Sequence, residues 1–332
     1  MRILVLGGTA WLGGTVAQTA LDRGHAVTAL ARGESGPVPA GVELVRADRS
    51  RPDAYAAVAE RDWDAVVDVS RQPSHVRSAL AALGERADHW SFVSSCSVYA
   101  AHDTPGADES AAVLPALAGD EATPETYGEG KVACEEAVLT AIRADRALVA
   151  RAGLIAGPGD PTDRTGYWPL RFAHPSADDG AVLVPDSPGV GTQVVDVRDL
   201  AAWLLTSAER GTSGVMNAAG PVVPLEEHLA TARRVAGHSG PVVAASPAWL
   251  AAQNVQEWAG ERSLPLWINT PGWEGFGARD TSRALTSGLS TRPLEETLAD
   301  TLAWEMRAGP GRPRRAGLTA DEERALLALA RS

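Results

Sequence analysis

Over roughly the first 150 residues, short runs of aliphatic and β-branched residues alternate with helical stretches. The predicted strands are apolar throughout, which is typical of strands buried on both faces; they are Ile3–Leu6, Ala26–Leu30, Val42–Val45, Ala65–Val69, Trp90–Ser94 and Ala147–Ala150. The predicted helices lie between them, at Trp11–Arg23, Ala54–Glu60, Ser74–Glu85 and Tyr127–Ala144. This alternation predicts an α/β fold of the Rossmann type, a doubly wound parallel sheet with helices on both faces.

Beyond residue 150 the regular alternation is lost. Gly157-Pro158-Gly159-Asp160-Pro161 has the composition of a loop, and Pro221–Gly277 is helical and loop-rich. A strand is expected at Gln193–Val197 and a helix at Asp199–Glu209. Two helices are expected near the C-terminus, an amphipathic one at Arg292–Arg307 and one whose start matches a capping box at Thr319 and Glu322.

These segments predict two parts of the chain. We expect residues 1–165 to form a dinucleotide-binding domain, to which segments near 190–220 return. We expect residues 166–332 to form mainly a smaller substrate-binding lobe and C-terminal helices.

Composition and charge limit the partners that the chain is expected to bind. A net charge of −12 over 332 residues argues against nucleic acids and anionic membranes, because both require a basic face. The cysteines, Cys96 and Cys134, show no metal-ligand spacing, so neither a disulfide framework nor a metal site is expected. No apolar run approaches the roughly 18 residues that cross a bilayer, and no signal-peptide pattern is present. We therefore expect a cytoplasmic protein.

A glycine-rich loop joins the first predicted strand to the first predicted helix. At such a junction the free backbone amides of the helix N-terminus bind a pyrophosphate. Gly7 permits the tight turn, and Gly13 lets the helix pack close to the strand. Trp11 and Leu12 are also expected to fill the core beneath the loop, and a plain strand-to-helix turn is the alternative. The residues expected to contact a dinucleotide are Gly7, Thr9, Ala10, Trp11, Leu12 and Gly13.

The end of the second predicted strand bears on the choice of cofactor. NAD-binding domains usually place an acidic residue there, which binds the adenosine ribose hydroxyls. This chain has Arg32 instead, and a guanidinium suits the 2′-phosphate of NADP. NADP(H) is therefore favoured and NAD(H) is possible, with a solvated surface arginine as the alternative. Asp48 is expected either to accept a hydrogen bond from adenine or to cap the following helix.

A proton-transfer group is predicted at the carboxyl ends of the strands, where sheet ligands bind. Tyr127 and Lys131 are spaced i and i+4, so they share one face of a helix. The lysine ammonium stabilises the phenolate, which lets Tyr127 exchange a proton with a carbonyl or an alcohol. Ser95 follows a buried strand and is expected to hydrogen-bond the same substrate oxygen. Its neighbours are interpreted differently, Ser94 and Ser97 as less favoured candidates and Cys96 as packing.

Together these motifs resemble the extended short-chain dehydrogenase/reductase superfamily, in its epimerase/dehydratase branch. The GGxxxxG loop, the SSxSVY strand end and the YGxxK motif carry the resemblance over roughly residues 1 to 305. Further stretches agree with it: Gly153–Gly159, Val195–Ala201 and Arg292–Thr297. The resemblance implies a Rossmann domain, a nicotinamide cofactor and a lobe that closes over the substrate, and it leaves a homodimer open. It assigns the catalytic roles to Ser95, Tyr127 and Lys131, with Lys131 also holding the nicotinamide ribose.

The chain departs from this family on the substrate side. Similar sugar-nucleotide epimerases carry an arginine for the substrate diphosphate, where this chain has Thr192 beside Gln193. The arginines that could replace it are Arg164, Arg171 and Arg292. Aromatic residues of the lobe could stack on a ring-bearing substrate, although core packing is favoured for each; they are Tyr167, Trp168, Trp267, Trp273 and Phe276. Solvated positions are expected for His102, Asp103, Arg312, Arg314 and Arg315.

The resulting hypothesis is an oxidoreductase that moves hydride between NADP(H) and a carbonyl/alcohol centre of a small organic substrate. One alternative is an epimerase or dehydratase that retains NAD and acts on a sugar or sugar nucleotide. Another is a non-catalytic nucleotide-sensing or RNA-binding protein on the same fold. The intact set of Ser95, Tyr127 and Lys131 argues against the last, because a pure binding protein needs no activated phenol.

Overall fold

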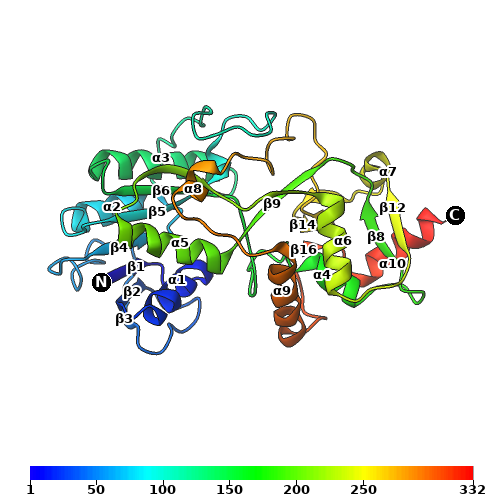
Figure 1. The fold of residues 1–332 in the computed structure, drawn as a ribbon, viewed down its shortest axis with the longest axis horizontal. Helices are drawn as coiled ribbons and strands as arrows, with labels where there is room; N and C mark the ends of the chain where they lie inside the picture. The colour runs from blue at the N-terminus through cyan, green and yellow to red at the C-terminus, as the bar shows by residue number, and fades with distance from the viewer. Residues whose placement is uncertain (332) are drawn as a thin grey trace.

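The computed structural model describes residues 1–331, and in this range seven parallel strands form the main sheet (Figure 1). The strands follow the spatial order β10-β6-β5-β4-β1-β2-β3. Their bounds are β1 Arg2–Leu6, β2 Ala26–Ala31, β3 Glu43–Arg46, β4 Ala65–Asp68, β5 Trp90–Ser95, β6 Ala147–Ala152 and β10 Gly214–Ala218. The chain reverses direction across the sheet between β1 and β4, the point at which doubly wound folds bind their ligands. The predicted α/β class is confirmed.

Helices cover both faces of this sheet (Figure 1). On one face lie α1 (Trp11–Asp22) and α5 (Val197–Arg210), and on the other lie α2 (Pro73–Leu83) and α3 (Tyr127–Ala141). Alternate residues of β1 serve the two cores: Ile3 and Val5 pack with α1 and α5, while Leu4 and Leu6 pack on the side of α2 and α3. Burial on both faces is why these strands are continuously apolar.

A second hydrophobic core holds the lobe together. It lies among α4 (Tyr167–Ala173), α6 (Leu225–Val235), α9 (Leu294–Ala308), α10 (Ala320–Ala330) and the strand pair β8 (Val182–Pro185) and β12 (Val242–Ala245). A small sheet of β11 (Val222–Pro224), β9 (Gly191–Asp196) and β7 (Leu154–Ala156) also forms, with β9 crossing between the main sheet and the lobe (Figure 1). The remaining elements are η1 Cys96–Val98, α7 Pro247–Ala252, β13 Gln256–Trp258, β14 Gly260–Glu261, β15 Ser263–Pro265, α8 Ser282–Thr286 and β16 Ala316–Gly317.

Most predicted elements lie within a few residues of the observed ones, and the capping box of Thr319 and Glu322 is present. The helix predicted at Ala54–Glu60 is wrong, because this stretch forms consecutive turns. Tyr55 is held there by a hydrogen bond from Arg49, and so short a segment gains little from helical propagation. The region Pro221–Gly277 contains short strands that sequence reasoning missed, since strands of two to four residues show no readable alternation.

Candidate active site

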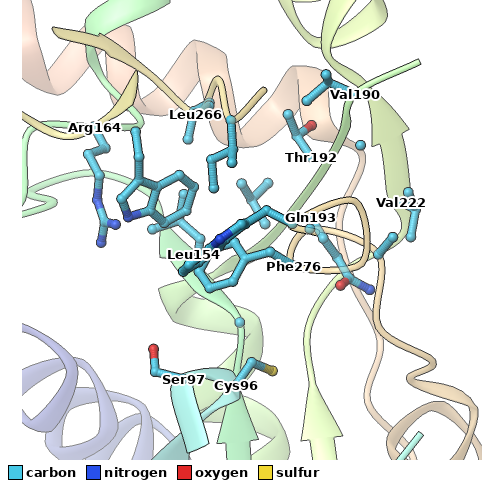
Figure 2. A pocket seen from close by; sticks show the side chains of 18 of the residues that line it. Cys96, Ser97, Leu154, Arg164, Val190, Thr192, Gln193, Val222, Leu266 and Phe276 are labelled. Carbon is cyan, nitrogen blue, oxygen red and sulfur yellow. The ribbon is translucent and has the colours of Figure 1, made fainter. Parts of the chain in front are cut away.

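A cleft of about 880 Å³ lies where the carboxyl ends of β5 and β6 face the lobe. Figure 2 shows Cys96 and Ser97 on one side of it and Val190, Thr192 and Leu266 on the opposite side. Apolar and aromatic side chains form much of the lining, and hydroxyl groups gather at the sheet side. This is the usual composition of a small-molecule site, an apolar pocket with a few placed polar groups.

Tyr127 lines this cleft as the first residue of α3. Its side chain is half-buried, and its hydroxyl forms no hydrogen bond with any residue in the described range. Gly128 explains the placement, because a Cβ there would lie 2.5 Å from the carbonyl oxygen of Ser97. Glycine thus lets the start of α3 pack directly on the turn after β5. The phenol is left available to a ligand in the cleft.

Ser95 lies across this turn, at the end of β5. Its Oγ accepts a hydrogen bond from the backbone N–H of Ser97 and donates one to Ser97 Oγ, both at 3.1 Å. Both serines line the cleft with Tyr127, so Ser97 is a second hydroxyl within the site. Ser94 is removed from the candidates, because its buried hydroxyl donates to Glu135 Oε1 at 2.5 Å. Cys96 packs as expected, and burial raises the pKa of its thiol to about 12.

Lys131 lies one turn along α3 from Tyr127 and is 3% exposed. Its ammonium donates to the carbonyl oxygen of Ser70 at 2.6 Å and to that of Val93 at 2.7 Å. It also lies 4.7 Å from the centroid of the Phe92 ring. Described residues therefore use two of the three N–H donors of an ammonium, which leaves one for a ligand.

A buried ion pair fixes α3 to the sheet beneath these residues. Arg151 of β6 donates from Nη2 to Glu135 Oε2 at 2.8 Å, and both side chains are less than a tenth exposed. Arg151 also donates to the hydroxyl of Tyr99 at 3.1 Å. Sequence reasoning missed this pair, although charges at Glu135 and Arg151 within otherwise apolar elements were a readable signal.

The glycine loop has the form needed for a pyrophosphate. Gly7 has a φ of +96°, and a Cβ on Gly13 would lie only 2.3 Å from the Gly7 carbonyl oxygen. Ala10 occupies the N-cap position of α1 without a side-chain cap, so the amides of the first turn stay free for an anion. Thr9 lies in the same turn, and Leu12 is buried beneath it as expected. These residues fit a dinucleotide cofactor.

Trp11 differs from its predicted position in the core. Its side chain is half-buried, lines the cleft and donates from Nε1 to the carbonyl oxygen of Pro158 at 2.8 Å. A carbonyl acceptor beyond β7 was within reach, so the indole spans from the glycine loop to the loop at Pro158 instead of turning inward. This contact joins sequence positions 147 residues apart.

The adenosine end of the proposed cofactor site carries exposed basic groups. Arg32 follows β2 and pairs with Glu34 at 3.1 Å, with both side chains well exposed. Arg46 of β3 pairs in register with Ala31, and its Nη1 donates to the Arg32 carbonyl oxygen at 3.4 Å. Sequence reasoning missed Arg46, which only the pairing of β2 with β3 brings to this edge.

Asp48 lies just beyond β3, near this edge. It caps no helix, since turns follow it, but it accepts hydrogen bonds from the backbone N–H and the hydroxyl of Ser50. These bonds lower the pKa of its carboxyl group.

Thr192 and Gln193 line the lobe side of the cleft, but their polar groups are engaged within the protein. Thr192 Oγ1 donates to the carbonyl oxygen of Val223 at 2.9 Å. Gln193 donates to the carbonyl oxygens of Gly220 and Arg279, at 2.9 and 2.8 Å. Neither side chain therefore replaces an arginine for a substrate diphosphate.

The three arginines considered for that role lie in different surroundings. Arg171 pairs with Glu323 at 3.0 Å, and Arg292 pairs with Asp199 at 2.8 Å. Arg164 lines the cleft.

The aromatic residues of the lobe divide between its core and the cleft. Tyr167, Trp168 and Trp267 are buried in the lobe core, as was favoured for each. Trp273 and Phe276 differ from the favoured core packing, because they line the cleft. Trp258, which sequence reasoning did not single out, lines it with them.

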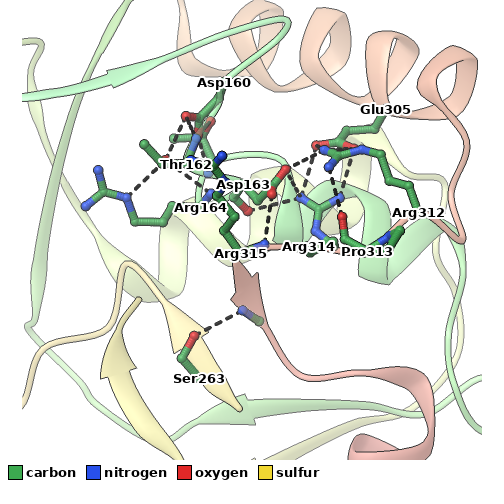
Figure 3. Close-up of polar contacts among 12 residues, drawn as sticks. Asp160, Thr162, Asp163, Arg164, Ser263, Glu305, Arg312, Pro313, Arg314 and Arg315 are labelled. Atoms are coloured by element: carbon green, nitrogen blue, oxygen red, sulfur yellow. Dashed lines mark hydrogen bonds and ion pairs between the residues drawn. The ribbon is translucent and has the colours of Figure 1, made fainter. Parts of the chain in front are cut away.

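Several positions expected to be solvated are not. The ring of His102 packs 4.7 Å from that of Trp273 and 5.0 Å from that of Phe276, whereas Asp103 is exposed as expected. Arg312 and Arg314 are largely buried in ion pairs with Asp163 and Glu305. Arg315 is exposed, and its backbone N–H donates to Asp163 Oδ2 at 2.9 Å (Figure 3).

Within residues 1–331 there is no cluster of three or more His, Cys, Asp or Glu side chains placed to hold a metal ion. Over the same range, no helix has the length and apolar character required to cross a membrane.

Comparison with known proteins identifies similar sequences and folds. The profile of the NAD dependent epimerase/dehydratase family matches residues 3–219. A curated relative, 2'-dehydrokanamycin reductase of Streptomyces kanamyceticus, is 30% identical over 194 residues, which are 56% of this chain and 52% of the relative. The chain thus spans about half the length of the curated relative it matches.

Solved structures share the fold along nearly the whole chain. A putative epimerase from Burkholderia cenocepacia J2315 superposes with a TM-score of 0.69 at 24% identity, covering 93% of this chain and 98% of the other. UDP-glucuronic acid 4-epimerase from Bacillus cereus, solved in complex with NAD, has a TM-score of 0.66 at 15% identity, with 93% and 99% covered. At these identities the likeness shows the fold.

Proposed function

The chain belongs to the NAD dependent epimerase/dehydratase family, and from this premise we propose that it is an NAD(P)-dependent oxidoreductase of small organic substrates. The observation that carries the proposal is that Tyr127, with an unengaged hydroxyl, lines one cleft together with Ser95. Lys131 lies one helical turn from Tyr127. When bound, the nicotinamide supplies or accepts the hydride at a carbonyl or alcohol carbon.

The chain's own residues handle the proton. Tyr127 gives a proton to the substrate oxygen during reduction and takes it back during oxidation. Ser95 donates a hydrogen bond to the same oxygen once its hydroxyl turns from Ser97 toward the cleft. Lys131 directs its remaining N–H to the cofactor ribose and stabilises the phenolate.

NADP(H) is the cofactor that this site favours. Arg32 and Arg46 lie at the carboxyl ends of β2 and β3, where the adenosine ribose of a dinucleotide lies in this fold. Both are exposed, and Arg32 would exchange its solvent-exposed pair with Glu34 for a 2′-phosphate, which a guanidinium binds in a bidentate manner.

Reduction is favoured over sugar-nucleotide epimerisation. The curated relative 2'-dehydrokanamycin reductase is a reductase, which supports hydride transfer to an external substrate. A buried diphosphate requires fixed cations, and the groups at Thr192 and Gln193 are neutral and already hydrogen-bonded within the lobe.

Cofactor analysis and one variant test the proposal. The purified protein should bind added NADPH and oxidise it with suitable ketones or aldehydes, and Tyr127→Phe should lower turnover by roughly 100-fold or more while cofactor binding survives. Tyr167→Phe is the matched control, because Tyr167 lies in the lobe core and does not line the cleft. Turnover that persists in Tyr127→Phe would remove this residue from the mechanism. Tightly bound NAD on purification would favour the hydride-recycling alternative.

A further inference from the structure

Arg164 is a cation of the cleft that the proposed chemistry does not use. It lines the cleft with Tyr127, and its Nε donates to Thr162 Oγ1 at 3.1 Å. Its guanidinium carbon lies 4.6 Å from the centroid of the Trp258 indole. No carboxylate of residues 1–331 forms an ion pair with Arg164.

Three other largely buried arginines, unlike Arg164, pair with carboxylates. Arg171 of α4 pairs with Glu323, and Arg312 and Arg314 both pair with Glu305. Burial lowers the pKa of the Arg164 guanidinium, while electrostatic interactions with Asp160 and Tyr127 act to raise it. Because a guanidinium stays charged in proteins, a partly desolvated one without a carboxylate gains strongly from an anionic ligand.

The loop that carries Arg164 is anchored on both sides of it (Figure 3). Asp160 is 3% exposed and accepts hydrogen bonds from the backbone N–H and hydroxyl groups of Thr162 and Thr165, at 2.7 to 3.1 Å. Asp163 is 4% exposed and pairs with Arg312. Arg164 directly follows Asp163 and lies between Thr162 and Thr165, which Asp160 anchors, so the backbone that carries its guanidinium is held in place before a ligand arrives. This lowers the entropy lost on binding.

The charged and apolar residues that line the cleft limit the class of ligand that it can bind. Its charged lining residues within the described range are Arg164 and Glu274, and Glu274 is exposed. One guanidinium balances one negative charge, whereas a buried phosphate or diphosphate would need further cations. Leu154, Trp258 and Phe276 line the same cleft and suit an apolar or ring-bearing body.

We propose that Arg164 determines the specificity of the cleft and that the substrate is a ring-bearing carbonyl compound or alcohol with a single carboxylate. This inference rests on the proposed function. The guanidinium binds the carboxylate through two parallel hydrogen bonds, which orients the carbonyl carbon toward Tyr127 and the cofactor.

Calorimetry with two matched probes tests this inference, on protein loaded with NADP⁺, which has no hydride to give to a ketone. The probes are 4-acetylbenzoate and 4-acetylbenzamide, which share the ring and the ketone and differ in charge. The native protein should bind the carboxylate at least about 10-fold more tightly than the amide. Arg164→Met should abolish this preference, because it keeps an apolar stem against Trp258 without the charge. Arg164→Lys should retain part of it, and Arg143→Met, a change at an exposed arginine just beyond α3, should retain all of it.

Equal affinities for the two probes, no binding of either, or a preference unchanged in Arg164→Met would each overturn the inference. NADPH affinity, measured separately, should stay unchanged in Arg164→Met; a loss there would assign Arg164 to the cofactor instead. Tyr127→Phe separates this inference from the proposed function. If that variant retains both the carboxylate preference and turnover, the catalytic proposal fails while the role of Arg164 stands.

Discussion

The Lys131 ammonium lies 2.6 Å from the carbonyl oxygen of Ser70, so a residue of the proposed catalytic group also joins α3 to the segment that follows β4. Its bond to Val93 extends this connection to β5. One buried side chain thus holds the helix that carries Tyr127 against the ends of neighbouring strands. Lys131 therefore has a proposed catalytic role and a structural one, which measurements of turnover and of unfolding assess separately.

Lys131→Met should lower both turnover and stability. The apolar stem survives, but the carbonyl oxygens of Ser70 and Val93 lose their donor, at about 1–3 kcal/mol for each group left unpaired. Denaturant unfolding should show this loss, while Tyr127→Phe, whose hydroxyl has no partner in the described chain, should unfold like the native protein. Unchanged stability in Lys131→Met would show that water readily replaces the ammonium.

Arg32→Ala and Arg46→Ala should each reduce the preference for NADPH over NADH. A charge-assisted hydrogen bond contributes about 1.5–3 kcal/mol, so each affinity ratio should fall by about 10- to 150-fold. The affinity for NADH should stay nearly constant, because NADH lacks the 2′-phosphate. Fluorescence titration of both cofactors measures the ratio, with the exposed Arg143→Ala as control. Equal affinities of the native protein for both cofactors would contradict the assignment.

UDP- and dTDP-sugars should bind with dissociation constants no tighter than about millimolar, or roughly −4 kcal/mol. Thr192 and Gln193 are engaged with backbone carbonyls, and Arg292 is paired with Asp199. Arg164 alone among the cleft-lining residues of the described chain offers a cation, too little for a buried diphosphate. Titration of cofactor-loaded protein with UDP and dTDP measures this. Micromolar binding of either would restore a nucleotide-sugar substrate.

The sequence predicts the strands of the main sheet and the glycine loop well. Strands buried on both faces must be apolar, and Gly7 and Gly13 mark the tight turn between β1 and α1. The spacing of Tyr127 and Lys131 likewise fixes a shared helix face, and the structure brings both to the region of Ser95. These inferences depend on neighbours in sequence or on the polarity of one element.

The missed features depend on partners far along the chain. Arg314 was expected in solvent, yet its partner Asp163 lies about 150 residues earlier and nothing in its own linker indicates burial. Arg46 reaches the proposed 2′-phosphate site only through the register of β3 on β2. Trp11 finds a carbonyl acceptor at Pro158, which no local pattern specifies.

Glu305→Gln should destabilise the protein strongly. Glu305 is 1% exposed and pairs with both Arg312 and Arg314. Replacing it with neutral glutamine therefore removes a carboxylate from two largely buried guanidinium groups. Breaking a buried ion pair from one side costs about 3–5 kcal/mol. Glu295→Gln on the same helix is the control, since its pair with Arg234 is more than half exposed and should be worth at most about 1 kcal/mol. Denaturant unfolding gives both values; similar small losses would show that water enters the cluster.

His228 should make the protein less stable in acid. It is fully buried, Thr192 Oγ1 lies 3.3 Å from its Nδ1, and burial lowers the pKa of the imidazole from 6.5 to about 4. Between these values the unfolded chain binds a proton that the folded chain does not, so the free energy of unfolding falls as the pH falls from about 6.5 to 4. A shift of this size corresponds to about 3 kcal/mol, lost fully below pH 4.

His228→Leu removes this titration, because it replaces the imidazole with an apolar group of similar size. Denaturant unfolding across this pH range should show the native protein losing about 3 kcal/mol more than the variant. The difference between the two curves isolates His228, because carboxylates and other histidines such as His89 titrate in both proteins. Above pH 6.5 the two curves should run parallel, since the imidazole is neutral in both folded and unfolded native chains. Parallel curves over the whole range would show that protonated His228 is accommodated in the fold, for instance by water reaching its unpaired Nε2.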